Sequence, residues 1–139
     1  MRMALSLVTA MTLLLGTGAP RAEDKPFACP AAPAPVVALN FGSRYTDDSK
    51  TRSDIDEVSN AEVDRALQPV EKFIGELMKM ANTALMDGDA ARGACVLDWL
   101  DQWAAAGALT ELETLNVKLA IPARYAGLAI ALMQAETAG

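Results

Sequence analysis

The sequence has 139 residues, with 12 Lys and Arg against 18 Asp and Glu, and no histidine. This length corresponds to one ordinary domain. The net charge of -6 argues against a nucleic-acid-binding protein, which would need a basic face. The missing histidine excludes a Ser-His-Asp or Cys-His catalytic pair and a His-ligated zinc. Two cysteines are too few for a Cys-only zinc or iron–sulfur site, so we expect no metal and no cofactor.

Residues 1–22 have the pattern of a signal peptide. Arg2 precedes an apolar run over residues 3–15, and small residues follow it up to Ala22. The run is too short to cross a bilayer as a stable helix, which favours a secretory signal over the alternative of an uncleaved anchor. Cleavage after Ala22 would remove Arg2 and Arg21, which lowers the basic count from 12 to 10 and the net charge from -6 to -8. No later segment approaches the length of a spanning helix, so we expect a periplasmic protein that has no membrane partner after processing.

Two cysteines in an exported chain most simply form one disulfide, Cys29–Cys95. It would close a loop of about 66 residues, which is worth about 4 kcal/mol in the chain-entropy model. Two free buried thiols, or a cross-link between chains, are the alternatives that the sequence leaves open. Neither thiol has an evident base or helix N-terminus beside it, so we expect neither to be catalytic.

The chain after the signal is predicted to have two parts. Residues 23–58 form an extended, Pro-rich leader and a charged loop, because four prolines in the leader exclude a helix there. Residues 59–139 form a helical domain, with apolar residues at helical spacing almost throughout.

The first helix is expected over residues 60–86. Pro69 should kink it or begin a second segment, because proline removes a backbone donor. Gly88 is expected to end this helix in a left-handed conformation, and Asp89 to cap a second helix over residues 90–106.

A third helical stretch is expected from residue 110 to residue 136, interrupted by Pro122. Thr110 and Glu113 match a capping box at its start. Residues 125–133 are apolar nearly all round and need cover, either in the core or between subunits. We therefore predict an all-α fold of antiparallel helical hairpins, with self-association through the C-terminal apolar helix.

Two groups of side chains are candidates for ligand binding. Tyr45 lies beside Arg44 and close to Lys50 and Arg52 in the loop. These cations could hold a sugar carboxylate, and a tyrosine among them could act as an acid or a base. The alternative is a solvated loop with a half-buried tyrosine.

Trp99 and Trp103 lie one helical turn apart and either stack on sugar rings or belong to the core. The sequence favours the core, because apolar residues flank both tryptophans on the same helix face. Lys118, Arg124 and Tyr125 form a further basic and aromatic group, for which an ordinary helix surface is the main alternative.

Three motifs together resemble the N-terminal third of the periplasmic alginate lyases, the poly(β-D-mannuronate) lyases. They are Cys29-Pro30 in the leader, Phe41-Gly-Ser-Arg-Tyr45 in the loop, and the run Ala94-Cys95-Val-Leu-Asp-Trp99-Leu-Asp-Gln-Trp103-Ala-Ala-Ala-Gly107-Ala-Leu109. The resemblance implies part of an (α/α) toroid-like layer, whose complete form encloses a tunnel-like cleft. It also implies alginate or a related polyuronate as substrate.

The resemblance assigns four substrate-binding positions. The family's Ser-Lys pair falls on Ser43 and Arg44, where arginine keeps the charge but replaces a point donor by a fork. Tyr45 completes this loop motif. The family's His-Thr pair falls on Asn116 and Val117, where an imidazole and a hydroxyl are lost.

The family's proton-transfer residues, an Asn-Asn-His segment and later Arg and Tyr, have no counterpart in the 139 residues. We therefore expect no catalytic residues, and a truncated, weak or inactive β-eliminating lyase with the neutralising wall of the cleft. The alternative is a non-catalytic exported helical module that binds acidic polysaccharide or a partner protein. Binding a polyanion would require the cations to gather on one wall, namely Arg44, Lys50, Arg52, Lys118 and Arg124.

Overall fold

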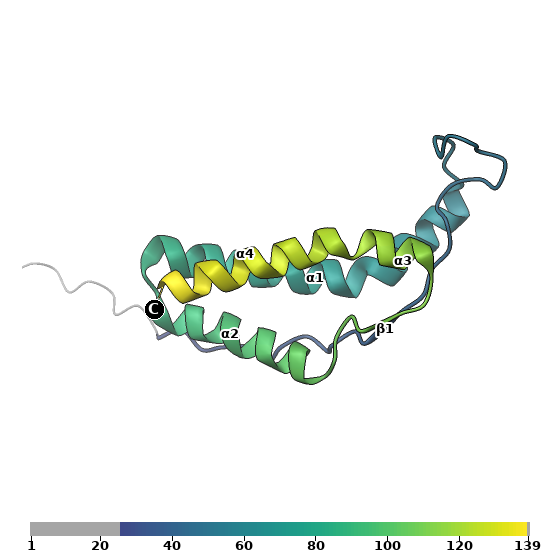
Figure 1. Ribbon diagram of the computed structural model, residues 1–139. Helices are drawn as coiled ribbons and strands as arrows, with labels where there is room; N and C mark the ends of the chain where they lie inside the picture. Colours follow the sequence, from purple (N-terminus) through teal and green to yellow (C-terminus); the bar gives the residue numbers. More distant parts are fainter. Residues whose placement is uncertain (1–25, 139) are drawn as a thin grey trace, which may run out of the picture.

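The computed structural model describes residues 26–138 (Figure 1). The predicted signal peptide, residues 1–22, lies outside the described residues. Within them the fold is all-α apart from one pair of two-residue strands, which confirms the predicted fold class. The elements follow the order β1 (Ala38–Leu39), α1 (Glu57–Asp87), α2 (Ala90–Ala105), β2 (Glu111–Leu112), α3 (Leu115–Ala120) and α4 (Pro122–Ala138).

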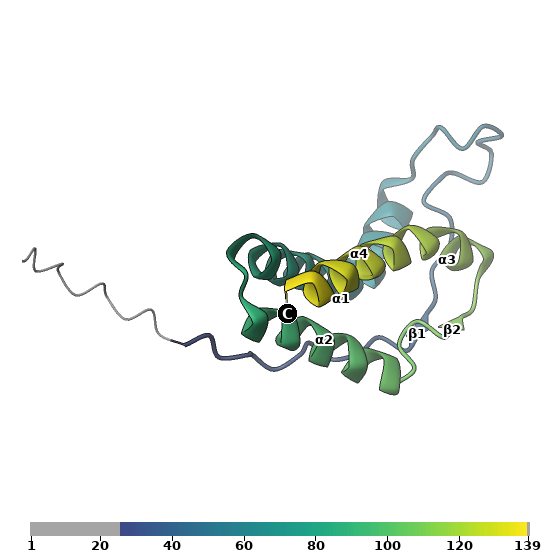
Figure 2. The ribbon, with the colours of Figure 1, turned by 60° about the vertical axis from the view of Figure 1, so that its left-hand side comes forward.

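Helices α1, α2 and α4 pack on one another, and both views place α2 below the other two (Figures 1 and 2). α1 and α2 form the expected antiparallel hairpin. α4 instead runs parallel to α1, because residues at a nearly constant separation in sequence meet along the pair. These contacts are Glu71 with Arg124, Ile74 with Gly127, and Asn82 with Gln134.

The turn between α1 and α2 follows the prediction. Gly88 has φ 63° and Asp89 caps α2 by accepting from the backbone N–H of Arg92 at 3.0 Å. Of the two alternatives expected at Pro69, a kink or a second segment, the second segment is wrong, because α1 continues through the proline as one helix. Buried residues flank Pro69 on both sides, including Leu67 and Val70, and their packing outweighs the lost backbone hydrogen bond.

The capping box expected at Thr110 and Glu113 is also wrong. α3 begins at Leu115, and its cap is Thr114. The preceding residues instead pair in parallel with the leader, where Leu109 N–H donates to Val36 O at 2.8 Å. The strand pair therefore delays the third helix by several residues.

The core centres on an aromatic stack. The Phe73 and Trp103 rings lie 3.6 Å apart between centroids and 5° from parallel, and Trp99 stacks further along on Phe73. Both tryptophans are almost fully buried. They are core residues, so their indole faces are not available to stack on sugars.

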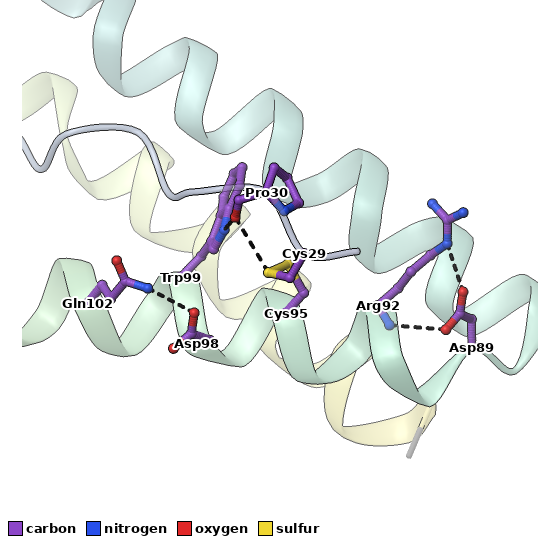
Figure 3. The surroundings of a disulfide bond; sticks show 8 residues. All are labelled: Cys29, Pro30, Asp89, Arg92, Cys95, Asp98, Trp99 and Gln102. Carbon is purple, nitrogen blue, oxygen red and sulfur yellow. Dashed lines mark hydrogen bonds and ion pairs between the residues drawn. A yellow bond between two sulfur atoms is a disulfide. The ribbon is translucent and has the colours of Figure 1, made fainter. Parts of the chain in front are cut away.

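Residues 26–41 form an extended strap that two hydrogen bonds and a disulfide fasten to α2, and the Arg92 guanidinium of α2 also lies over the Phe27 ring of the strap at 4.5 Å. Trp99 Nε1 donates to Pro30 O and Trp103 Nε1 donates to Pro33 O, both at 2.9 Å. The disulfide is Cys29–Cys95, which the structure contains and which Figure 3 shows beside Trp99. The indole N–H groups thus satisfy strap carbonyls that would otherwise lie unpaired on the core.

One stretch of the described chain, Leu115–Ala138, is long and apolar enough to cross a membrane by length and composition alone. This corrects the expectation that no segment after the signal has such a length. In the fold the stretch is divided at Ile121 into α3 and α4. α4 buries Ala131 and Ala135 in the core formed with α1 and α2.

Two glycines mark close helix contacts and give the first prediction. A Cβ on Gly93 would lie 3.0 Å from the backbone oxygen of Ala135, and a Cβ on Gly127 would lie 3.1 Å from Ile74 Cγ2. Gly93→Ala should lower the free energy of unfolding by about 1–2 kcal/mol, because backbone must move. Gly127→Ala should be near neutral, because a side chain can yield and alanine favours the helix by about 1 kcal/mol. Urea unfolding of both variants checks this order, and equal effects would contradict it.

The helix caps predict a pH dependence. Hydrogen bonds from the backbone N–H of Ser59 to Asp56 and of Arg92 to Asp89 lower the pKa of both carboxyls below their ordinary value. Their stabilising effect is therefore present above the ordinary pKa and is lost as the pH falls through the lowered one.

Replacing both cap residues, Asp56→Asn with Asp89→Asn, should flatten the fall in unfolding free energy between about pH 5 and about pH 2, because asparagine caps without titrating. The same substitution at the exposed Asp48 is the control. If the unfolding free energy of the double variant falls as steeply with decreasing pH as that of the unaltered protein, the two caps do not cause the pH dependence. Urea unfolding at several pH values measures it.

Candidate functional site

The four positions that the resemblance assigned to substrate binding line a single cavity. Ser43, Arg44 and Tyr45 form one wall, and Asn116 of α3 lies on another. The cavity has a volume of about 100 Å³. Its other lining residues are Phe41, Gly42, Val63 and Ala120. The cavity thus lies where the end of the strap, the start of α1 and helix α3 meet, although these segments are far apart in sequence.

Thr114 joins the two walls. Its hydroxyl donates to Phe41 O at 2.7 Å, and its oxygen accepts from the backbone N–H of Val117 at 3.3 Å. One side chain therefore fixes the end of the strap and the start of α3. Nearby, Asn40 Nδ2 donates to Glu113 Oε2 at 2.6 Å, which ties the same two segments together again.

The loop that carries Arg44 and Tyr45 returns to the first turn of α1. Ser43 Oγ accepts from the Tyr45 N–H at 3.1 Å, and Arg44 O accepts from the Asp56 N–H at 3.0 Å. Tyr45 and Ile55 form an antiparallel bridge across the loop. These bonds hold residues 43–45 against α1 and so give the cavity wall a defined position.

Arg44 is held from behind by α1. Its Nη1 donates to Asn60 Oδ1 at 3.0 Å, and its Nη2 lies 3.7 Å from Asp64 Oδ1. The side chain is 35% exposed, so the guanidinium is still open to solvent. It can accept a carboxylate through charge-assisted hydrogen bonds, in competition with Asp64.

The cationic wall expected from five residues is not formed. Of these five, Arg44 alone lines the cavity. Arg124 turns to α1, where its Nε donates to Glu71 Oε1 at 2.9 Å. Lys50, Arg52 and Lys118 do not line the cavity. Lys50 and Arg52 are exposed on the loop, and Lys118 is exposed on α3.

The group of Lys118, Arg124 and Tyr125 does not act as a unit either. Tyr125 Oη donates to Leu109 O at 3.0 Å, so it anchors the turn after α2. Lys118 is exposed on α3. Lys118 therefore belongs to an ordinary helix surface. Arg124 and Tyr125 instead join separate segments of the chain through their hydrogen bonds.

The sequence reasoning missed three residues that position the cavity, namely Asn60, Asp64 and Thr114. Asn60 and Asp64 are neighbours on one helix face, but nothing in their spacing indicates that they hold an arginine from a distant loop. Thr114 had a detectable signal, because threonine before an apolar helical run is a common cap. Thr110 carries the same signal four residues earlier, and Glu113 favours it by completing a capping box.

No family model matches the chain. Curated relatives nevertheless resemble it over part of its length. An alginate lyase of Pseudomonas putida is 33% identical over 91 residues, which is 65% of this chain and 24% of the relative. A polysaccharide lyase of Stenotrophomonas maltophilia is 33% identical over 82 residues, 59% of this chain and 24% of the relative.

An alginate lyase of Azotobacter vinelandii is 31% identical over 87 residues, 62% of this chain and 23% of the relative. The chain spans about a quarter of the length of these relatives. Over roughly three-fifths of its own length it therefore resembles part of the alginate and polysaccharide lyases, as its leader, loop and tryptophan motifs predicted.

Proposed function

We propose that the cavity binds a uronate unit of an alginate-like acidic polysaccharide, in an exported chain related to polysaccharide lyases. The observation that supports this most is the meeting of Ser43, Arg44, Tyr45 and Asn116 around one cavity. The names of the relatives point to the same class of substrate. The disulfide Cys29–Cys95 and the signal-like residues 1–22 support a periplasmic location.

The chemistry of the cavity suits one end of a sugar unit. Its volume of about 100 Å³ is well above the ~10–15 Å³ that one water molecule needs by the same measure, which leaves space for a carboxylate. Arg44 would bind the carboxylate with its guanidinium fork. The Ser43 hydroxyl and the Asn116 amide would exchange hydrogen bonds with ring hydroxyls.

A β-elimination needs more than this. The proton at C5 must be removed, and the oxygen leaving C4 must be protonated. Among the lining side chains only Tyr45 and Arg44 carry exchangeable acidic or basic groups, and Arg44 stays protonated. Tyr45 alone would have to supply the proton transfers, so we expect weak elimination or none by this chain. A non-catalytic exported binding module, for acidic polysaccharide or a partner protein, is the alternative that the same observation favours.

The binding proposal predicts that Arg44→Ala raises the dissociation constant for a mannuronate oligosaccharide by about tenfold or more. This is the scale of a lost charge-assisted hydrogen bond. Arg65→Ala is the matched control, since Arg65 is exposed on α1 and makes the same charge change. Isothermal titration with a mannuronate oligosaccharide measures both variants. Equal losses would show only general electrostatic attraction and would contradict a site at Arg44.

Asp64→Asn provides a test of opposite sign in the same titration. The substitution removes the carboxylate that competes for Arg44. The Arg44 guanidinium then becomes free for the ligand, so binding should strengthen several-fold. Asp87→Asn, at the far end of α1, is the control for the change in net charge. Similar gains in both variants would argue against competition at Arg44.

The lyase proposal predicts a slow increase in the ultraviolet absorbance of unsaturated uronate on incubation with polymannuronate, and its loss in Tyr45→Phe. Binding without any absorbance change would select the non-catalytic module. An absorbance change that survives Tyr45→Phe would contradict the role given to this hydroxyl, and absence of both binding and absorbance change would overturn the proposal.

A further inference from the structure

A second cavity, here called the strap cavity, lies between the strap, α1 and α2. It has a volume of about 260 Å³. None of its lining residues also lines the cavity at Arg44. Val63 in the one cavity and Glu76 in the other are about 20 Å apart along the axis of α1, at 1.5 Å per residue. The strap cavity is therefore a separate place on the molecule, independent of the proposed polysaccharide site.

Apolar side chains line part of the strap cavity. They are Phe27 and Pro30 of the strap, Met80 of α1 and Trp99 of α2. Between the two strap residues, Cys29 is bonded to α2 by the disulfide, and Trp99 Nε1 donates to Pro30 O (Figure 3). These bonds hold the apolar lining in place. An apolar cavity of about 150 Å³ can hold benzene, so the strap cavity has space for a six-membered ring with a substituent.

Two cationic side chains line the same cavity. Lys79 is exposed on α1 and forms no ion pair within residues 26–138. Arg92 donates from Nε to Asp89 Oδ2 at 2.8 Å, and its guanidinium lies over the Phe27 ring. Its two terminal nitrogens point away from Asp89 in Figure 3, and the side chain is 35% exposed. They therefore remain available to an acceptor such as a carboxylate, through charge-assisted hydrogen bonds.

The charges around the strap cavity favour an anion. Glu76 is the one acidic lining residue among those that the structure describes, and it lies 4.0 Å from Lys72. Glu76 and Lys72 offset each other, as do Arg92 and Asp89. The charge of Lys79 is then left over. The cavity is thus locally positive on a chain whose net charge is -6.

We propose that the strap cavity binds a small organic anion, namely a carboxylate that carries an aromatic ring or a short alkyl chain. The carboxylate accepts hydrogen bonds from Arg92 and Lys79, and the apolar body covers Phe27 and Met80. An inorganic anion leaves this apolar lining in water. A sugar unit places hydroxyls against it, and each hydroxyl that loses water without gaining a partner weakens binding.

The two tryptophans give a matched pair of reporters for this site. Both indole N–H groups donate to strap carbonyls at 2.9 Å, but Trp99 lines the strap cavity and Trp103 does not. In an NMR titration of the full chain with phenylacetate, the Trp99 indole signal should shift and saturate, while the Trp103 signal changes little. Acetate has the carboxylate without the ring. It should bind at least about tenfold more weakly, because the apolar lining stays uncovered.

Substitutions of the charged lining residues should change the affinity in opposite directions. Lys79→Gln should raise the dissociation constant of phenylacetate about tenfold, the scale of one lost charge-assisted hydrogen bond. Lys118→Gln, at an exposed position on α3, makes the same change outside the strap cavity and should bind like the unaltered protein. Glu76→Gln should lower the dissociation constant several-fold, because it removes a like charge beside the carboxylate. The amide spectrum of each variant verifies that it is folded.

The proposal fails if phenylacetate gives no saturating shift at Trp99, or if Lys79→Gln and Lys118→Gln weaken binding equally. A shift confined to Trp103 would also overturn it, because the ligand would then lie in the apolar groove between α2 and α4, which Trp103 lines. If acetate or a mannuronate oligosaccharide shifts the Trp99 signal as readily as phenylacetate does, the apolar body has no part in binding and the ligand class is wrong.

Discussion

The attachment of the strap to α2 is the constraint on which the rest of the structure depends. The indole N–H groups of Trp99 and Trp103 bind carbonyls of the strap while their rings form the core with Phe73. Because the strap lies there, its end delivers residues 41–45 to the start of α1. It also pairs with residues 109–113, and this pairing determines that α3 begins at Leu115. Both walls of the candidate cavity are therefore placed by one packing arrangement.

The electrostatics of the cavity favour binding over chemistry. Arg44 is oriented by a neutral amide on one side and by a carboxylate at a longer distance on the other. This arrangement holds the guanidinium in position and neutralises it only in part, which suits recognition of a ligand carboxylate. Proton transfer would rest on Tyr45 alone. A chain that resembles lyases but has few groups able to transfer a proton is consistent with a surface that binds the polysaccharide without cleaving it.

Local signals predicted the parts of the fold that local chemistry decides. Gly88, Asp89 and Pro122 end or start helices as their residue types require. The sequence could not place the start of α3, because Thr110 and Thr114 are equivalent caps until the strap pairs with the residues between them. Likewise the family motifs predicted Arg44 as a binding residue, but its contact with Asn60 depends on the loop folding back onto α1.

We propose that residues 41–45 and Asn116 form one ligand site. An amide NMR titration with a mannuronate oligosaccharide tests it most directly. If the site exists, chemical-shift changes should saturate together at the backbone amides of Ser43, Arg44, Tyr45 and Asn116, with little change along α2. Saturating changes confined to other surfaces, or none at these four amides, would contradict it.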